Sequence, residues 1–152
     1  MRYAQTRDIL LHQVAPYHRT ASQLYSDFSQ GELSPRNRLM IDFLVEHEMR
    51  LSLAILNFME SAPDRAVDYW FKRIEIPFPA VDPGVLTDAC RFCLDDLTGA
   101  AIVHKEALIG FFNHLLQNCD SEETFHLFST LKQQEEKGMK RFIRQSQGLA
   151  DL

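Results

Sequence analysis

Four polar side chains fall on or beside the apolar stripes of the predicted helices, where they could do chemistry. They are His18, His47, Asp96 and Glu135. Imidazole and carboxylate groups together suit zinc, iron or manganese, so one interpretation is a metal site inside the protein. The other is that these groups satisfy one another by hydrogen bonds, because a buried polar group without a partner is costly. Both interpretations need helices that bring the four side chains into a common interior.

Apolar residues recur every three or four positions through most of the chain, which predicts amphipathic helices. The clearest stripe contains His47 among the apolar residues Met40, Leu44, Leu51, Ala54 and Phe58. Pro16 interrupts the first helical pattern and predicts either a bend near His12 or a helix that begins at Pro16. The predicted long helices run over about 3–28, 35–61, 88–117 and 121–147, with a short helix over about 63–73.

The lengths of the connections predict how these helices are joined. Gly31 is expected to end the first helix, and Ser34 and Pro35 have the residue types that cap and begin the second. Thr87 is expected to cap the third long helix, and Asp120 with Glu123 the fourth. The order short, long, short predicts two antiparallel helix pairs joined by one long crossover. The sequence therefore predicts a single all-α domain, a four-helix bundle over residues 1–152.

Four short segments resemble the ferritin-like superfamily, and more nearly the small rubrerythrin-like bacterial bundles. The segments are His18-Arg-Thr-Ala-Ser-Gln-Leu-Tyr25, Leu44-Val-Glu-His-Glu48, Leu94-Asp-Asp-Leu97 and Leu131-Lys-Gln-Gln-Glu-Glu136. In that superfamily these places hold the carboxylates and histidines of a di-iron centre. The resemblance implies a ferritin-like fold and a candidate metal set of His18, His47, Asp95, Asp96 and Glu135.

The chain departs from the family pattern at the metal ligands. Family members place Glu-x-x-His on the second and fourth helices, whereas here Glu135 is followed three residues later by Gly138. His18 stands where the family has a glutamate. The candidate ligands are therefore fewer than a di-iron pair needs, and any metal would be held by a reduced set of histidine and carboxylate groups.

Three other motifs carry weaker chemical signals. Cys90 and Cys93 form a lone Cys-x-x-Cys, to be interpreted as a redox pair or as core residues. Glu123 and His126 form the one intact Glu-x-x-His, near the start of the last helix, where capping explains Glu123. His104 lies on an apolar stripe of the third long helix, and we expect it to be a satisfied core or rim histidine.

Composition excludes several functional classes. The formal net charge is -5 and the pI is about 5.6, which argues against nucleic-acid binding because that needs a basic face. No apolar run approaches the roughly 18 residues of a membrane span. The polar residues at the start of the chain do not have the pattern of a secretory signal, so we expect a cytoplasmic protein.

The sequence favours a non-catalytic bundle that acts through its surface and forms a homodimer. The aromatic crossover around Trp70 and Phe78 is either a dimer contact or an intramolecular strap, since aromatic residues are enriched at interfaces. The alternative is a metal-binding protein for redox chemistry or iron handling. Its metal would be iron, manganese or zinc in the core.

Overall fold

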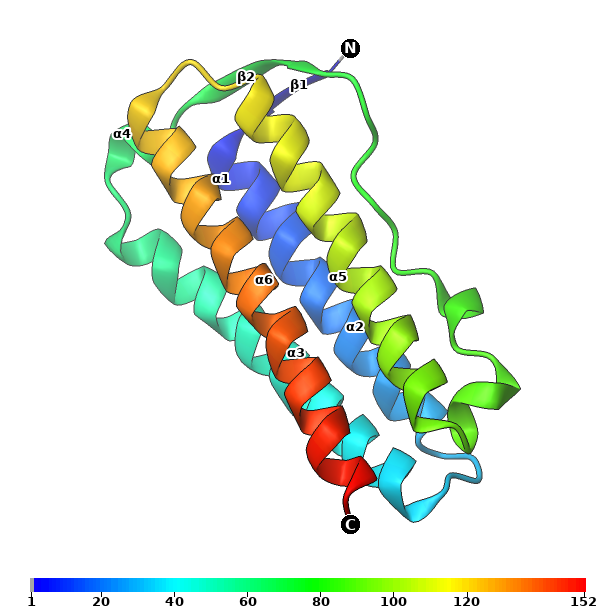
Figure 1. Ribbon diagram of the computed structural model, residues 1–152. Coiled ribbons are helices and arrows are strands. Elements are labelled where there is room, and N and C mark those ends of the chain that lie inside the picture. Colours follow the sequence, from blue (N-terminus) through cyan, green and yellow to red (C-terminus); the bar gives the residue numbers. More distant parts are fainter. Residues whose placement is uncertain (1) are drawn as a thin grey trace.

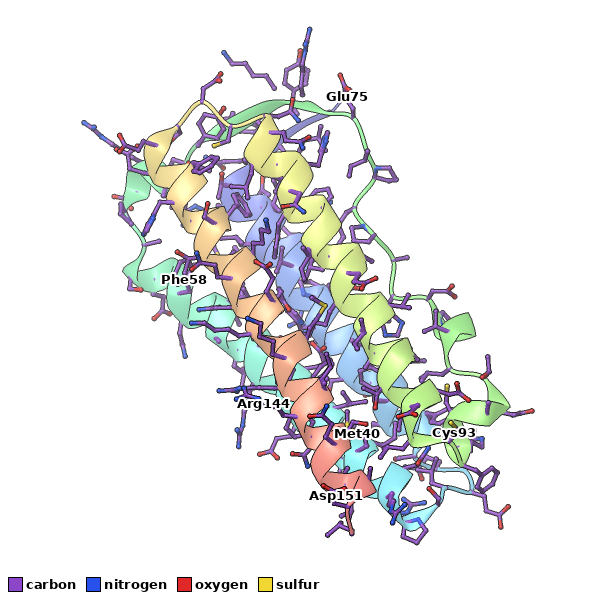
Figure 2. All side chains as sticks on the ribbon, in the orientation of Figure 1. Met40, Phe58, Glu75, Cys93, Arg144 and Asp151 are labelled. Carbon is purple, nitrogen blue, oxygen red and sulfur yellow. The ribbon has the colours of Figure 1, made fainter. Side chains whose placement is uncertain are left out.

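The computed structural model describes residues 2–152 and confirms an all-α protein with one small sheet. Figure 1 shows the long helices lying side by side, with the two chain ends at opposite ends of the molecule. Figure 2 shows Glu75 at the end that carries the sheet, and Cys93 and Asp151 at the opposite end. The long helices are α2 (Ala15–Phe28), α3 (Pro35–Ser61), α5 (Leu94–Gln117) and α6 (Glu122–Ala150).

Short turns join the long helices in pairs, as the sequence predicts. Ser34 caps α3 through a hydrogen bond from the Asn37 amide, and Pro35 occupies the first turn. Ser121, rather than Asp120, caps α6 by accepting a hydrogen bond from the Thr124 amide. Helices α2 and α3 therefore form one hairpin, and α5 and α6 form the other.

The first helical segment begins at Thr6 and contains a π-helical turn. It consists of α1 (Thr6–Ile9), the π-helical turn η1 (Leu10–Val14) and α2. Pro16 has no N–H, and in a regular α-helix its ring would clash with the carbonyl four residues earlier. The wider turn accommodates it, and the Ala15 amide donates to the carbonyl of Leu10, five residues back. The helix therefore neither stops nor restarts at Pro16.

Two segments predicted as helix form strands instead. β1 (Arg2–Gln5) pairs antiparallel with β2 (Trp70–Ile74), with Ala4 opposite Phe71. The short helix α4 (Asp64–Val67) accordingly ends well before residue 73. Aromatic and β-branched residues in β2 favour extended backbone, and the pairing satisfies their backbone groups. The two strands close one end of the molecule.

The crossover after β2 runs along α5 to the opposite end of the molecule. Its short 3₁₀ turns are η2 (Pro83–Val85) and η3 (Asp88–Arg91), so α5 begins at Leu94 and not at residue 88. Phe78 packs edge-on against Tyr17 and Phe111. The His104 ring lies 3.0 Å from the Asp82 carbonyl through Nε2, and 2.7 Å from the Tyr25 hydroxyl through Nδ1. His104 is thus a satisfied core histidine, as expected, and it ties the crossover to the helices.

The buried stripe of α3 differs from the predicted one. His47, Leu51 and Phe58 are only half-buried and Ala54 is exposed. The side chains that face the core from this part of the helix are instead Glu48, Ser52, Ile55 and Met59. Met40 and Leu44 are buried as predicted, but from His47 onward the buried positions lie one residue later than predicted, which places a carboxylate rather than an imidazole at the centre.

Candidate functional site

One side chain from each long helix meets in a buried charged cluster. The four residues are His18 from α2, Glu48 from α3, Lys105 from α5 and Glu135 from α6. Their exposed fractions are 0%, 1%, 1% and 3%. Charged side chains are almost never this buried unless they are paired. We call these four residues the core cluster.

Each cation of the core cluster lies between both carboxylates. The Lys105 ammonium is 2.7 Å from Glu135 Oε2 and 3.2 Å from Glu48 Oε1. His18 Nδ1 lies 2.6 Å from Glu48 Oε2, and Nε2 lies 2.7 Å from Glu135 Oε1. The Nδ1 contact has hydrogen-bond geometry, whereas the Nε2 contact is too bent for a hydrogen bond and is an ion pair. The result is a closed ring of alternating charge.

The charges of the core cluster balance. Burial opposes the imidazolium, but the negative charges of Glu135 and Glu48 outweigh it and raise the pKa of His18 to about 9. Burial likewise opposes the ammonium, and the two carboxylates nevertheless raise the pKa of Lys105. For Glu135, burial is overcome by Lys105 and His18, which lower its pKa to about 2. The pKa of Glu48 is lowered for the same reason. Two positive and two negative groups are therefore buried together at neutral pH.

Aromatic groups shield this ring of charges from water. The Phe142 ring centroid lies 5.5 Å from the Lys105 ammonium. The Tyr17 ring packs edge-on against His18 at 5.9 Å, and the Tyr17 hydroxyl donates to the backbone carbonyl of His104. Burial and the two nearby carboxylates raise the pKa of Tyr17, so it stays a neutral phenol. The four charged side chains of the core cluster are therefore enclosed by the helices and by these aromatic rings.

The sequence predicted two members of the core cluster, His18 and Glu135. It missed Glu48 and Lys105. Lys105 lies in a pattern that could have revealed it, because Ala101, Leu108 and Phe112 mark a buried stripe with spacings that include position 105. Because lysine is so rarely buried, its residue type alone predicts that position 105 is exposed, in spite of the apolar stripe around it.

The other three predicted ligands lie outside the core cluster. Asp95 and Asp96 are exposed in the first turn of α5, and at 1.5 Å per residue Asp96 is about 13 Å along the helix from Lys105. The prediction that Asp96 belongs to the interior is therefore wrong. Leu97 and Thr98, the next two residues, are buried, so the side of α5 that faces the core at this end carries them and leaves the two aspartates in solvent.

His47 lies at the edge of the core, between aromatic rings. Its ring packs against Phe43 of the same helix and Phe142 of α6, and a Cβ added at Gly138 would lie 3.1 Å from its Nε2. Its Nε2 is buried and has no hydrogen-bond partner in the described part of the chain. Burial, with the Lys105 charge, lowers the pKa of His47 to about 4. It is a neutral aromatic group at pH 7.

The remaining motifs are separate from the core cluster. Cys90 is buried on η3 and Cys93 is exposed before α5, so neither lies in the first turn of a long helix. No disulfide joins any of the cysteines within residues 2–152. Glu123 and His126 are exposed near the start of α6. None of these groups approaches His18 or Glu135 closely enough to share a site with them.

The residues present do not fit a metal ion. An imidazole ligates through a nitrogen lone pair, but at its raised pKa His18 is protonated on both nitrogens, and each nitrogen lies within 2.7 Å of a carboxylate oxygen. Lys105 has no lone pair at its raised pKa and already occupies the space between the two glutamates. Across residues 2–152, no group of three or more His, Cys, Asp or Glu side chains is arranged to hold a metal. The ammonium and imidazolium supply the positive charge that a metal would otherwise bring.

None of the helices within residues 2–152 combines the length and the apolar character that crossing a bilayer requires. No protein-family model, curated protein or solved structure matches the chain.

Proposed function

We propose that this chain is a metal-independent, non-catalytic helical bundle that works by binding a partner through its surface. The observation that carries the proposal is the position of Lys105, whose ammonium contacts both buried carboxylates. A charge-balanced cluster whose members are buried and paired with one another offers no open coordination position and no acid or base within reach of a substrate. Its role in this proposal is to fix the four helices relative to one another, so that their outer faces form a rigid binding surface.

We further propose that the fold is a ferritin-like bundle of the rubrerythrin type whose metal centre has been replaced by ion pairs. Support comes from the two helix pairs, the long crossover and a cluster that draws one residue from each long helix. In this interpretation His18 and Lys105 take the place of two metal-binding carboxylates. The histidines that would follow Glu48 and Glu135 at the third residue are Leu51 and Gly138.

Metal analysis of the purified full chain tests this proposal. We expect substoichiometric iron, manganese and zinc, and a thermal midpoint that does not change when each metal is added, because a ligand raises stability only if the folded state binds it. Stoichiometric metal that is lost in the His18→Ala and Glu135→Ala variants would contradict the proposal.

The Lys105→Glu variant tests whether the Lys105 ammonium is what keeps a metal ion out of the core cluster. It leaves three buried carboxylates and one imidazole with no ammonium, which is a set that prefers a divalent cation. We expect the variant to be strongly destabilised without metal and to regain several degrees of thermal midpoint with Mn²⁺ or Zn²⁺. The exposed Lys140→Glu exchange makes the same charge change on α6 and should show no metal effect. If metal raised the thermal midpoints of both variants equally, the proposal that the Lys105 ammonium replaces a metal ion would be contradicted.

We also propose that the chain forms a homodimer through the sheet end of the molecule. Tyr3 and Trp70 are 66% and 52% exposed and border one shallow hollow. Phe78 packs against Tyr17 of α2 and Phe111 of α5, so of the two aromatic residues Trp70 is the one available for a contact with a second copy. Light scattering after gel filtration should give a dimer mass for the wild type and a monomer mass for Trp70→Ser. The Phe92→Ser variant, at the opposite end and 62% exposed, should remain dimeric. A monomeric wild type at high concentration would refute the contact.

A further inference from the structure

A groove runs along the surface between α3 and α6. It consists of three adjoining hollows of about 160, 260 and 300 Å³. The first two share His47, Leu51, Ala54 and Arg141, and the third shares Phe43 and Arg141 with the first. Along α6 the groove extends from Gln134 to Gln145, which is about 16 Å at 1.5 Å per residue. We call it the α3–α6 groove.

The floor of this groove is apolar because α3 has more apolar surface than the core uses. Leu51 stays half-buried and Ala54 is exposed, although both continue the stripe that contains His47 and both line the groove. On the α6 side, Gly138 has no side chain to fill the space, and a Cβ there would lie 3.1 Å from His47 Nε2. The groove is thus an apolar helix face that its own chain leaves uncovered.

The walls of the groove are basic, in contrast to the net charge of -5 for the whole chain. Four basic residues line it, Arg50, Lys137, Arg141 and Arg144, against one carboxylate, that of Glu46. Figure 2 shows Arg144 on α6 near the C-terminal end of the chain. Arg50 is paired with Glu46, but within residues 2–152 no carboxylate lies within 4 Å of the basic groups of Lys137, Arg141 or Arg144. These three unpaired cations, next to an apolar floor, favour a partner whose binding surface is negatively charged.

The shape of the groove favours a helix as its occupant. Small-molecule sites enclose most of their ligand, whereas this groove is open along its length. A length of about 16 Å matches three turns of helix at 5.4 Å per turn. Helix-in-groove recognition places apolar residues at i, i+3, i+4 and i+7 on the floor and flanking charges against the walls.

We infer that the α3–α6 groove is the docking site for an acidic amphipathic helix of a partner protein. The inference rests on the proposed surface-binding function and names the class of partner. The apolar side of that helix covers Leu51, Ala54 and Phe43, and its glutamate or aspartate side chains pair with Lys137, Arg141 and Arg144. The core cluster beneath holds α3 and α6 at a fixed separation, so the groove is formed before the partner arrives.

Binding of designed peptides to the full-length chain tests this assignment. The probe is a fluorescein-labelled 16-residue helix with leucine at i, i+3, i+4 and i+7 and glutamate on both flanks, measured by fluorescence anisotropy. Its control carries lysine in place of every glutamate. We expect the acidic peptide alone to bind, and its affinity to fall when salt shortens the screening length from about 10 Å at 0.1 M to about 3 Å at 1 M. The Lys137→Glu/Arg141→Glu variant should bind at least about tenfold more weakly.

Two matched variants separate the groove from a general charge effect. Lys72→Glu/Lys132→Glu makes the same charge change at two residues that do not line the groove, and should leave peptide affinity unchanged. Ala54→Arg fills the floor while adding positive charge, and should also weaken binding about tenfold, whereas Leu53→Arg on the outer face should not. Circular dichroism and thermal midpoints check that all variants are folded.

Several outcomes would overturn the assignment. These are no binding of the acidic peptide, equal binding of the acidic and basic peptides, or equal losses in the groove and control variants. A wild-type dimer that Arg141→Glu dissociates without peptide would show that a second copy occupies the groove. Saturable binding of dodecanoate that Arg141→Glu abolishes, without peptide binding, would identify an anionic amphiphile instead. Each of these results leaves the metal analysis unaffected, so the failure of one proposal can be told from the failure of the other.

Discussion

Replacing Lys105 by methionine is expected to lower the free energy of unfolding by about 4 kcal/mol. Methionine fills a similar volume but leaves Glu48 and Glu135 facing each other with one cation, His18, between them. Removal of one partner from a buried ion pair costs about 3–5 kcal/mol, because the charge left behind is neither solvated nor paired. Urea denaturation with linear extrapolation measures the change. The same exchange at exposed Lys140 should change stability by less than about 0.5 kcal/mol.

A second variant shows whether the loss comes from charge imbalance. Lys105→Met/Glu135→Gln removes one charge of each sign, so the remaining His18 and Glu48 still pair at 2.6 Å. We expect the double variant to be more stable than the sum of the two single losses predicts, with a coupling energy of about 1–3 kcal/mol. A loss below about 1 kcal/mol for Lys105→Met, or strictly additive losses, would show that the core cluster does not act as one charged unit.

Stability is expected to fall on the alkaline side of neutrality, by on the order of 3 kcal/mol between pH 6.5 and pH 9. The pKa of His18 rises from 6.5 to about 9 on folding, and each pH unit corresponds to about 1.36 kcal/mol. Since the folded state holds the proton more tightly, this contribution is complete below pH 6.5. It is lost as the pH rises through 9. The physical reason is that a neutral imidazole leaves Lys105 as the one cation between two carboxylates.

The loss of stability at acidic pH comes from other groups, Glu135 and His47, and occurs over a different pH range. The pKa of Glu135 falls from 4.5 to about 2 on folding, so its contribution is present above pH 4.5 and lost as the pH falls toward 2. His47, whose pKa is lowered to about 4, also disfavours the folded state once the pH drops below 6.5. Urea denaturation at a series of pH values should therefore show maximal stability near pH 6–7.

The His18→Gln variant is the control for the alkaline decline, which should disappear when the imidazole is absent. If this variant does not fold, NMR titration of the His18 ring in the wild type gives the same information directly. A His18 pKa near 6.5, or a stability that is flat between pH 7 and 9, would contradict the ion-pair geometry.

The sequence was sufficient to predict the four long helices and the order of short and long connections between them, because both depend on local signals. Apolar periodicity identified the long helices, and Ser34 with Pro35 identified the start of α3. The strands were missed because β1 and β2 are far apart in the chain, and Trp70–Ile74 pairs with a segment that itself appears helical. Pairing over such a distance leaves no periodic signal in either segment.

The site was only half predictable, for a reason of packing. An apolar stripe marks the core when one face of a helix is buried, but α3 has apolar residues both in the core and in the α3–α6 groove. The wider stripe drew the prediction toward His47 and away from Glu48. Lys105 could be recognised only with the two carboxylates placed beside it, and that required the tertiary arrangement of α3, α5 and α6.

The arrangement of the core cluster also bears on how the protein assembles. The hairpin of α2 and α3 carries His18 with Glu48, and the hairpin of α5 and α6 carries Lys105 with Glu135. Each hairpin therefore contributes one cation and one carboxylate to the core cluster, so these two charges cancel within each hairpin. When the halves dock, no net charge has to leave water, and the contacts His18–Glu135 and Lys105–Glu48 then select the correct alignment of one half on the other.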